Sequence, residues 1–138
     1  MPLALYRRHR RDCKAGHPEE LRTSEVRYRT VFQTSLDGIA ISRIDDGRYI
    51  DVNPAFLKMM KYERHEVIGR TSEELGAWTD LKIRQGIAEA LRQESSIRDL
   101  IIPYKRKTGE IFWMQLSASV IQIEGVSCIL SVVRDISL

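Results

Sequence analysis

The last third of the chain limits the fold more than any other part. Between residues 96 and 137, three apolar stretches are separated by a Thr-Gly pair at 108–109 and a Glu-Gly pair at 124–125. In the middle stretch apolar residues occupy every second position, as at Phe112 and Met114. A period of two is typical of a strand with one buried face, and Gly-containing pairs favour tight turns. This part of the chain therefore predicts three antiparallel strands.

Proline indicates the order of these strands. Pro103 cannot donate a hydrogen bond to a neighbouring strand, so we expect its strand, the first of the three, to lie at an edge of the sheet. The middle strand would then pair with this edge strand and with the final one. Trp113 points to the opposite face from Met114, so the back of the sheet should carry apolar surface that another element covers.

A second antiparallel pair is predicted near residues 38–53. Two short apolar runs are joined by Asp45-Asp46-Gly47, and Asp-Gly tolerates the positive φ angles of a hairpin turn. Ile39 and Ile41 should share one face of the first strand. With the final strand placed next to this first one, the sheet has five strands.

An N-terminal flanking helix is predicted over residues 18–36. Pro18 suits a helix start and Gly38 a helix stop. Apolar residues at helical spacing form one stripe on it, namely Leu21, Tyr28, Phe32 and Leu36. We expect this stripe to be a packing face, with a parallel coiled-coil seam as the alternative.

The middle of the chain carries several helix start signals. Asn53, followed by Pro54, can cap a short helix, and we favour this role over ligand binding. A second short helix should end at Gly69. Thr71 and Glu74 have the spacing of a capping box, which predicts a third helix.

A longer helix is predicted over residues 81–93, capped by Asp80, with Ile83 and Ile87 on one face. Gly86 lies inside it and should allow close backbone approach. A hairpin, a group of helices and a meander together predict an α+β fold, with one antiparallel sheet and helices gathered on one face.

Four segments in this order resemble PAS domains, over about residues 24–138. They are EVRYRTVFQTSLDGIAI, YIDVNPAFLKMMKYERHEVIGR, YKRKTGEIFWMQLSAS and VVRDIS. The resemblance implies a five-stranded antiparallel sheet of order 2-1-5-4-3, with short helices on one face, and a core domain at 37–138. It also implies a sensory module, with Asp135-Ile136-Ser137 in place of the Asp-Ile-Thr signature and a histidine kinase or diguanylate cyclase output domain following.

The same resemblance limits the cofactors. Flavin photosensors of the family carry a reactive Cys in a motif that corresponds to residues 69–78, where this chain has none, so the sequence excludes a cysteinyl-flavin adduct. Haem-binding relatives place an axial His on the long helix, which has none here, and His65 is expected to be solvated. Trp78 is interpreted as a packing residue rather than a flavin stack. No catalytic or metal-binding motif is found, and the ligand remains unknown.

Two functions from different classes follow from the resemblance. In the first, a small molecule binds between the sheet and the long helix, in a pocket lined by Ile41, Phe56, Met60, Ile83, Ile87, Ile102, Met114 and Leu116. A filled core without a ligand is the alternative for these apolar residues. In the second, the chain is a ligand-free relay that forms a homodimer through Leu21, Tyr28, Phe32, Leu36 and Trp113. Neither reading makes the domain an enzyme.

The charge of the chain is concentrated at its N-terminus. Residues 1–17 hold five basic side chains and one acidic one, and the remainder holds 17 basic and 18 acidic ones. We expect a mobile basic tail, with nucleic acid or anionic lipid as less favoured partners and no nucleic-acid contact by the body. No apolar run approaches the ~20 residues of a membrane span, so we expect a cytoplasmic domain. Cys13 and Cys128 are expected to be free thiols.

Overall fold

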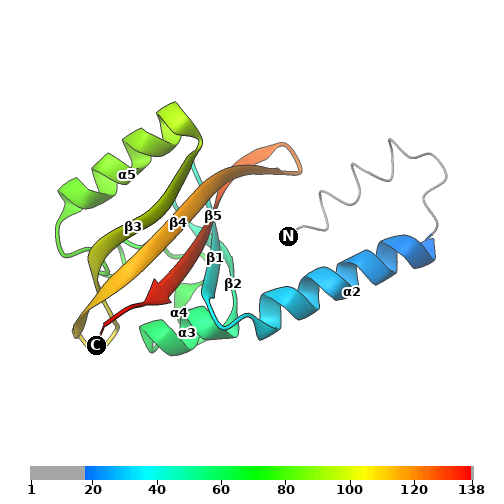
Figure 1. Cartoon of the computed structure of the whole chain (residues 1–138), viewed down its shortest axis with the longest axis horizontal. Helices are drawn as coiled ribbons and strands as arrows, with labels where there is room; N and C mark the ends of the chain where they lie inside the picture. The colour runs from blue at the N-terminus through cyan, green and yellow to red at the C-terminus, as the bar shows by residue number, and fades with distance from the viewer. Residues whose placement is uncertain (1–17, 138) are drawn as a thin grey trace.

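The structure is a computed structural model that describes residues 18–137, with side chains from residue 26 onward. The predictions made for residues 1–17, for Cys13 and for the Leu21 side chain fall outside the described residues. Figure 1 shows one curved sheet with helices α3, α4 and α5 beside it and helix α2 projecting from the body.

The sheet has the predicted strands and order. Its strands are all antiparallel to their neighbours and lie in the order β2-β1-β5-β4-β3. Their bounds are Gly38–Arg43 for β1, Tyr49–Val52 for β2, Ser96–Lys105 for β3, Ile111–Ile123 for β4 and Val126–Asp135 for β5. The turn predicted between the first two strands is confirmed, with Gly47 at φ +72°. The α+β class and the strand order are therefore as expected.

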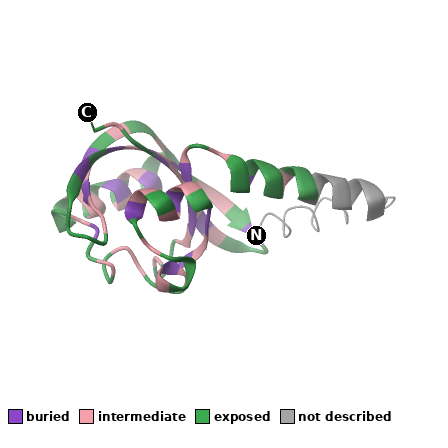
Figure 2. Ribbon diagram, turned by 90° about the horizontal axis from the view of Figure 1, so that it is seen from below, coloured by how far each residue is buried: buried purple, intermediate pink, exposed green. Residues whose placement is uncertain are grey.

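The helices fall into two groups by the sheet face that they cover. Their bounds are Pro18–Thr34 for α2, Pro54–Met60 for α3, Arg64–Val67 for α4 and Leu81–Glu94 for α5. The side chains that α3, α4 and α5 bury join one large core with the front of the sheet. Phe32 of α2 joins a smaller cluster on the back of the sheet. Figure 2 shows the described part of α2 largely exposed where it leaves the body.

Asn53 caps α3, as predicted, and also joins three elements. Its side-chain oxygen accepts hydrogen bonds from the Phe56 amide at 3.0 Å and the Ile39 amide at 2.8 Å. Its amide nitrogen donates to the carbonyl oxygens of Phe32 and Asp37, both at 3.0 Å. The side chain is fully buried, with 0% exposure. One residue therefore fastens the end of α2 and the start of β1 to α3.

The third short helix predicted after Gly69 is not formed, although its start signal is present. The Thr71 hydroxyl accepts from the Glu74 amide at 3.0 Å, and the Glu74 carboxylate accepts from the Thr71 amide at 2.9 Å. The chain then runs through turns and reaches Gly76 at φ +69°, a conformation that ends a helix. A capping box therefore starts only a turn here.

Two predictions for glycines are wrong. The flanking helix ends at Thr34, and Gly38 is the first residue of β1 rather than a helix stop. A Cβ at Gly38 would lie 2.8 Å from Cγ2 of Val133, so the residue is small because β1 and its neighbours pack closely there. At Gly86, by contrast, no atom lies within 4 Å of a built Cβ, so no backbone approaches α5 at this point.

Both borders of the sheet are protected. Strand β3 is an edge, as Pro103 predicted, and its register shifts between Ile97 and Leu100, where Asp99 has φ +52°. At the other border the outer side of Tyr49 in β2 is already bonded, because it donates to Arg70 and accepts from Gly69 at 2.9 Å each. Bulges, prolines and covering segments of this kind discourage the addition of a further strand.

Candidate functional site

A cavity of about 230 Å³ lies between the front of the sheet and α5. Its larger aliphatic, Met and Phe lining residues are Ile44, Phe56, Ile87, Leu91, Met114, Leu116, Ile129 and Val133. Four of these, namely Phe56, Ile87, Met114 and Leu116, are among the eight pocket residues that the sequence predicted. The pocket is therefore in the expected layer of the fold, between the sheet and the long helix.

The strand register explains why this space is not filled. Ala40 of β1 pairs with Ser131 of β5, which pairs on its other side with Ala118 of β4. All three residues line the cavity, so one row across three neighbouring strands carries only small side chains. Ala88 of α5 is a further small residue in the lining. Close-packed cores leave few voids larger than a water molecule, and such a row leaves one.

The other four predicted pocket residues lie elsewhere. Met60 and Ile102 are buried in the same core but do not line the cavity, and Ile83 packs against that core from its margin. The prediction for Ile41 is wrong, because Ile41 lies on the back of the sheet, in the cluster that contains Phe32. Its neighbour Ala40 faces the cavity instead.

A group of polar side chains forms one wall of the cavity. The Trp78 indole N–H donates to the Ser72 hydroxyl at 2.8 Å, and the Trp78 ring packs edge-on against Tyr104 at 5.0 Å between centroids. Burial raises the pKa of the Tyr49 and Tyr104 hydroxyls. All four residues line the cavity. The wall is therefore uncharged at neutral pH.

Three arginines supply the charge in the lining. Arg43 belongs to β1, and Arg84 and Arg92 belong to α5. Arg84 pairs with Glu73 at 2.9 Å, and Arg92 pairs with Glu89 at 3.0 Å. Arg43 pairs with Asp46 in the β1–β2 turn.

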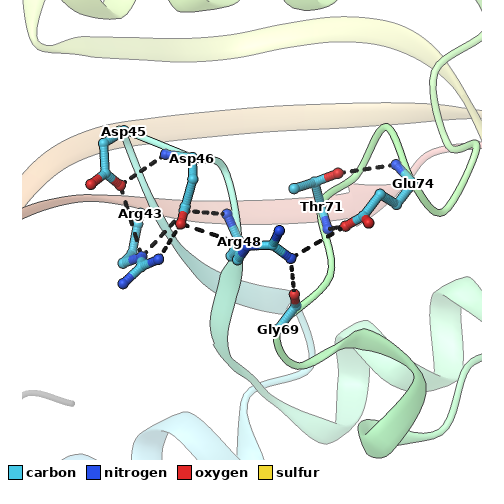
Figure 3. A network of polar contacts seen from close by, with 7 residues as sticks. All are labelled: Arg43, Asp45, Asp46, Arg48, Gly69, Thr71 and Glu74. Atoms are coloured by element: carbon cyan, nitrogen blue, oxygen red, sulfur yellow. Dashed lines mark hydrogen bonds and ion pairs between the residues drawn. The ribbon is translucent and has the colours of Figure 1, made fainter.

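A network of ion pairs ties the β1–β2 turn to the segment after α4 (Figure 3). Arg48 contacts Asp46 at 3.7 Å and Glu74 at 3.6 Å, and it donates to the Gly69 carbonyl at 2.6 Å. The hydrogen bond from Arg43 lowers the pKa of Asp46. These groups are solvated, so each pair contributes little stability, but together they fix the turn that borders the cavity.

Arg106 connects the core to the end of β5. Its guanidinium donates to the Asp135 carboxylate at 2.7 Å and to the Met59 carbonyl at 2.7 Å, and it lies 4.0 Å above the Phe112 ring. Only 10% of the side chain is exposed. Arg106 therefore links Asp135, of the Asp135-Ile136-Ser137 motif, to α3.

Ser137 belongs to the same motif. Its hydroxyl accepts from the Trp113 amide at 2.9 Å, and its own amide donates to Asp135 at 2.9 Å. The serine that replaces threonine in the motif therefore uses its hydroxyl to extend the pairing of β5 with β4. The chain leaves the sheet beside Trp113, whose side chain is 54% exposed on the back face.

The residues predicted to form a dimer are divided between buried and exposed positions. Phe32 is 3% exposed and packs in the cluster on the back of the sheet, so its side chain offers little surface to a second copy. Tyr28 stacks against Phe32 at 5.8 Å between centroids. Trp113 and Leu36 are exposed, as is Val31 of α2. An apolar surface therefore remains on the back of the sheet and on α2.

Neither a metal-binding cluster nor a membrane-spanning helix occurs among the described residues. No three His, Cys, Asp or Glu side chains among them are grouped closely enough to hold a metal ion. His65 is solvent-exposed, as predicted. In the same part of the chain, no helix combines the length and the apolar character needed to cross a membrane.

Comparison with known proteins agrees with this architecture. Residues 36–137 match the family model described as PAS domain. The blue-light-activated histidine kinase of Brucella canis is 42% identical over 77 residues, which is 55% of this chain and 16% of that protein. The chain thus spans about a sixth of the length of this curated relative.

Two solved structures illustrate the similarity of the fold. A PAS domain from Colwellia psychrerythraea superposes with a TM-score of 0.71 at 21% identity, covering 80% of this chain and 95% of that one. The LOV domain of a blue-light activated histidine kinase from Erythrobacter litoralis has a TM-score of 0.62 at 28% identity, covering 74% and 97%.

Proposed function

The chain belongs to the PAS domain family, and from this premise we propose that it is a sensor that binds a small, largely apolar molecule in the cavity. The row of small residues formed by Ala40, Ser131 and Ala118 supports this proposal most directly. An apolar cavity of about 150 Å³ is enough for benzene, and ligand pockets usually begin near 300 Å³. A cavity of about 230 Å³ lies between these sizes and suits a molecule of one or two small rings.

The relay step is proposed to run through β5. Ser131 and Val133 line the cavity, and Asp135 lies two residues further along the same strand. Arg106 holds Asp135 while it rests on Phe112, a residue of the core. A ligand that binds one arrangement of this strand better than another shifts the balance between them, by as much as its affinities differ. The change would pass to a histidine kinase or diguanylate cyclase domain that follows Asp135-Ile136-Ser137.

Filling the cavity tests the sensor function. Met114→Trp adds a large ring at the cavity wall, and Ile111→Trp adds the same ring to the exposed back face of the same strand as a control. Each purified protein is denatured, and the released small molecules are identified by mass spectrometry. We expect release from the wild type and the control but not from Met114→Trp, with folding checked by circular dichroism. Release from all three proteins, or from none, contradicts the proposal.

The second candidate is a ligand-free dimer that relays a signal from another domain. The exposed apolar side chains of Val31, Leu36 and Trp113 favour it, because exposed apolar patches mark interaction surfaces. Replacing Leu36 and Trp113 together with Glu should then yield monomers in light scattering. An unchanged mass in solution would show that these residues are not part of a dimer interface.

A further inference from the structure

The charges that line the cavity are all of one sign. Arg43, Arg84 and Arg92 are in the lining, and no Asp or Glu of the described residues is. The acidic partners of the three arginines are not lining residues. A molecule inside the cavity therefore contacts guanidinium groups rather than carboxylates.

Two of these arginines lie on the same face of α5. Arg84, Ala88 and Arg92 are spaced four residues apart, which places them one above another along the helix. All three line the cavity, and the small Ala88 leaves room between the two long side chains. The helix therefore presents two guanidinium groups separated by a gap.

Arg84 also reaches toward the β1–β2 turn. Its Nη1 lies 2.9 Å from Glu73, and its Nη2 lies 3.6 Å from the position that a Cβ on Gly47 would occupy. The guanidinium is thus between α5 and the β1–β2 turn. An arginine has five N–H donors, and this ion pair does not occupy them all.

The rest of the lining is uncharged and largely apolar. Its polar groups include Ser72 and Trp78, and the Trp78 indole N–H donates to the Ser72 hydroxyl at 2.8 Å. Phe56, Met114 and other apolar residues form much of the remainder. A molecule that fits this lining has an apolar body and one anionic group beside the arginines.

We infer, on the premise that the cavity binds a ligand as proposed above, that this ligand is a small apolar carboxylate held by Arg84 and Arg92 of α5. Guanidinium groups bind carboxylates through paired, charge-assisted hydrogen bonds. Each arginine is already paired with one glutamate, so a carboxylate would be held by the guanidinium N–H donors that this partner leaves free.

The test compares an acid with its neutral amide of the same shape. The probes are 3-phenylpropionate and 3-phenylpropanamide, titrated into the protein while chemical shifts of its backbone amides are followed by NMR. The variants are Arg84→Gln and Arg92→Gln, with Arg98→Gln as a control that removes the same charge from an exposed residue of β3 outside the cavity.

The wild type and the Arg98→Gln control should bind the acid about tenfold more tightly than the amide, as expected for a hydrogen bond to a charged group. Either cavity variant should lose most of that preference and bind the amide as before. Equal affinity for both probes in the wild type, or a preference kept by either cavity variant, overturns the carboxylate assignment and leaves the sensor proposal standing. If neither probe shifts cavity residues at millimolar concentration, both proposals fail.

Discussion

Replacing Asn53 with Ala should destabilise the domain much more than the loss of an ordinary helix cap. The substitution removes four side-chain hydrogen bonds, to the amides of Ile39 and Phe56 and to the carbonyls of Phe32 and Asp37. Each such bond contributes about 0.5–1.5 kcal/mol net. Because the site is fully buried, the four partners are left without water, and we expect a loss of about 4 kcal/mol.

The matched control is Asp80→Ala, which removes the exposed cap of α5. Asp80 accepts one capping hydrogen bond, from the Lys82 amide at 2.9 Å, and its loss should cost about 1 kcal/mol. Urea denaturation followed by tryptophan fluorescence gives both unfolding free energies by linear extrapolation. Equal losses for the two variants would refute the view that Asn53 does more than cap α3. Faster hydrogen exchange in the last turn of α2 of the Asn53 variant would locate the effect.

Three further substitutions test separate features. Gly86→Ala should raise the free energy of unfolding by about 0.5–1 kcal/mol in the same assay, because the site is open and alanine favours a helix. Gly38→Ala should lower it by about 1–3 kcal/mol, because the new Cβ would meet Val133 at 2.8 Å; a gain in stability would contradict the close packing. Burial acts to raise the pKa of Asp135, but its hydrogen bonds, first among them the one from Arg106, hold this pKa below its ordinary value. A carboxyl whose pKa is lower in the folded state stabilises the fold above its unfolded pKa, and this stability disappears as pH falls through the folded pKa. Asp135→Asn should therefore weaken the loss of unfolding free energy below about pH 5. An unchanged dependence of stability on acid pH would contradict this.

The sheet could be predicted from the sequence because its signals are local. Turn residues such as Gly47 and the alternation along residues 111–123 depend only on near neighbours in the chain. Pro103 placed its strand at an edge because a missing N–H has the same consequence in any sheet. These features fixed the pairing before any contact between distant residues was considered.

The side on which a strand buries its residues was harder to predict. Alternation correctly placed Ile39 and Ile41 on one face, but it does not say whether that face is the front or the back of the sheet. The decision comes from α2, which brings Phe32 against the back and so provides apolar cover for Ile41. Its size alone favours Ile41 for the main core, but the residue of β1 that packs there is the small Ala40.

The cavity depends on register and on distant segments, which explains why only part of it was predicted. The row of Ala40, Ser131 and Ala118 follows from the pairing of three strands that are far apart in sequence. Tyr49 and Tyr104 come from opposite edges of the sheet, and nothing near either residue indicates the other. The small-residue row could have been found by aligning the strands in their predicted order.

The protected borders of the sheet limit how copies of this domain could combine. The addition of a strand from a neighbouring molecule is discouraged at both borders, by the register shift and Pro103 in β3 and by the segment bonded to β2. Association would then use a face of the sheet. A face that contacts its own copy across a two-fold axis is no longer available to a third molecule. An assembly built on such a contact would be finite, a pair of domains rather than a filament.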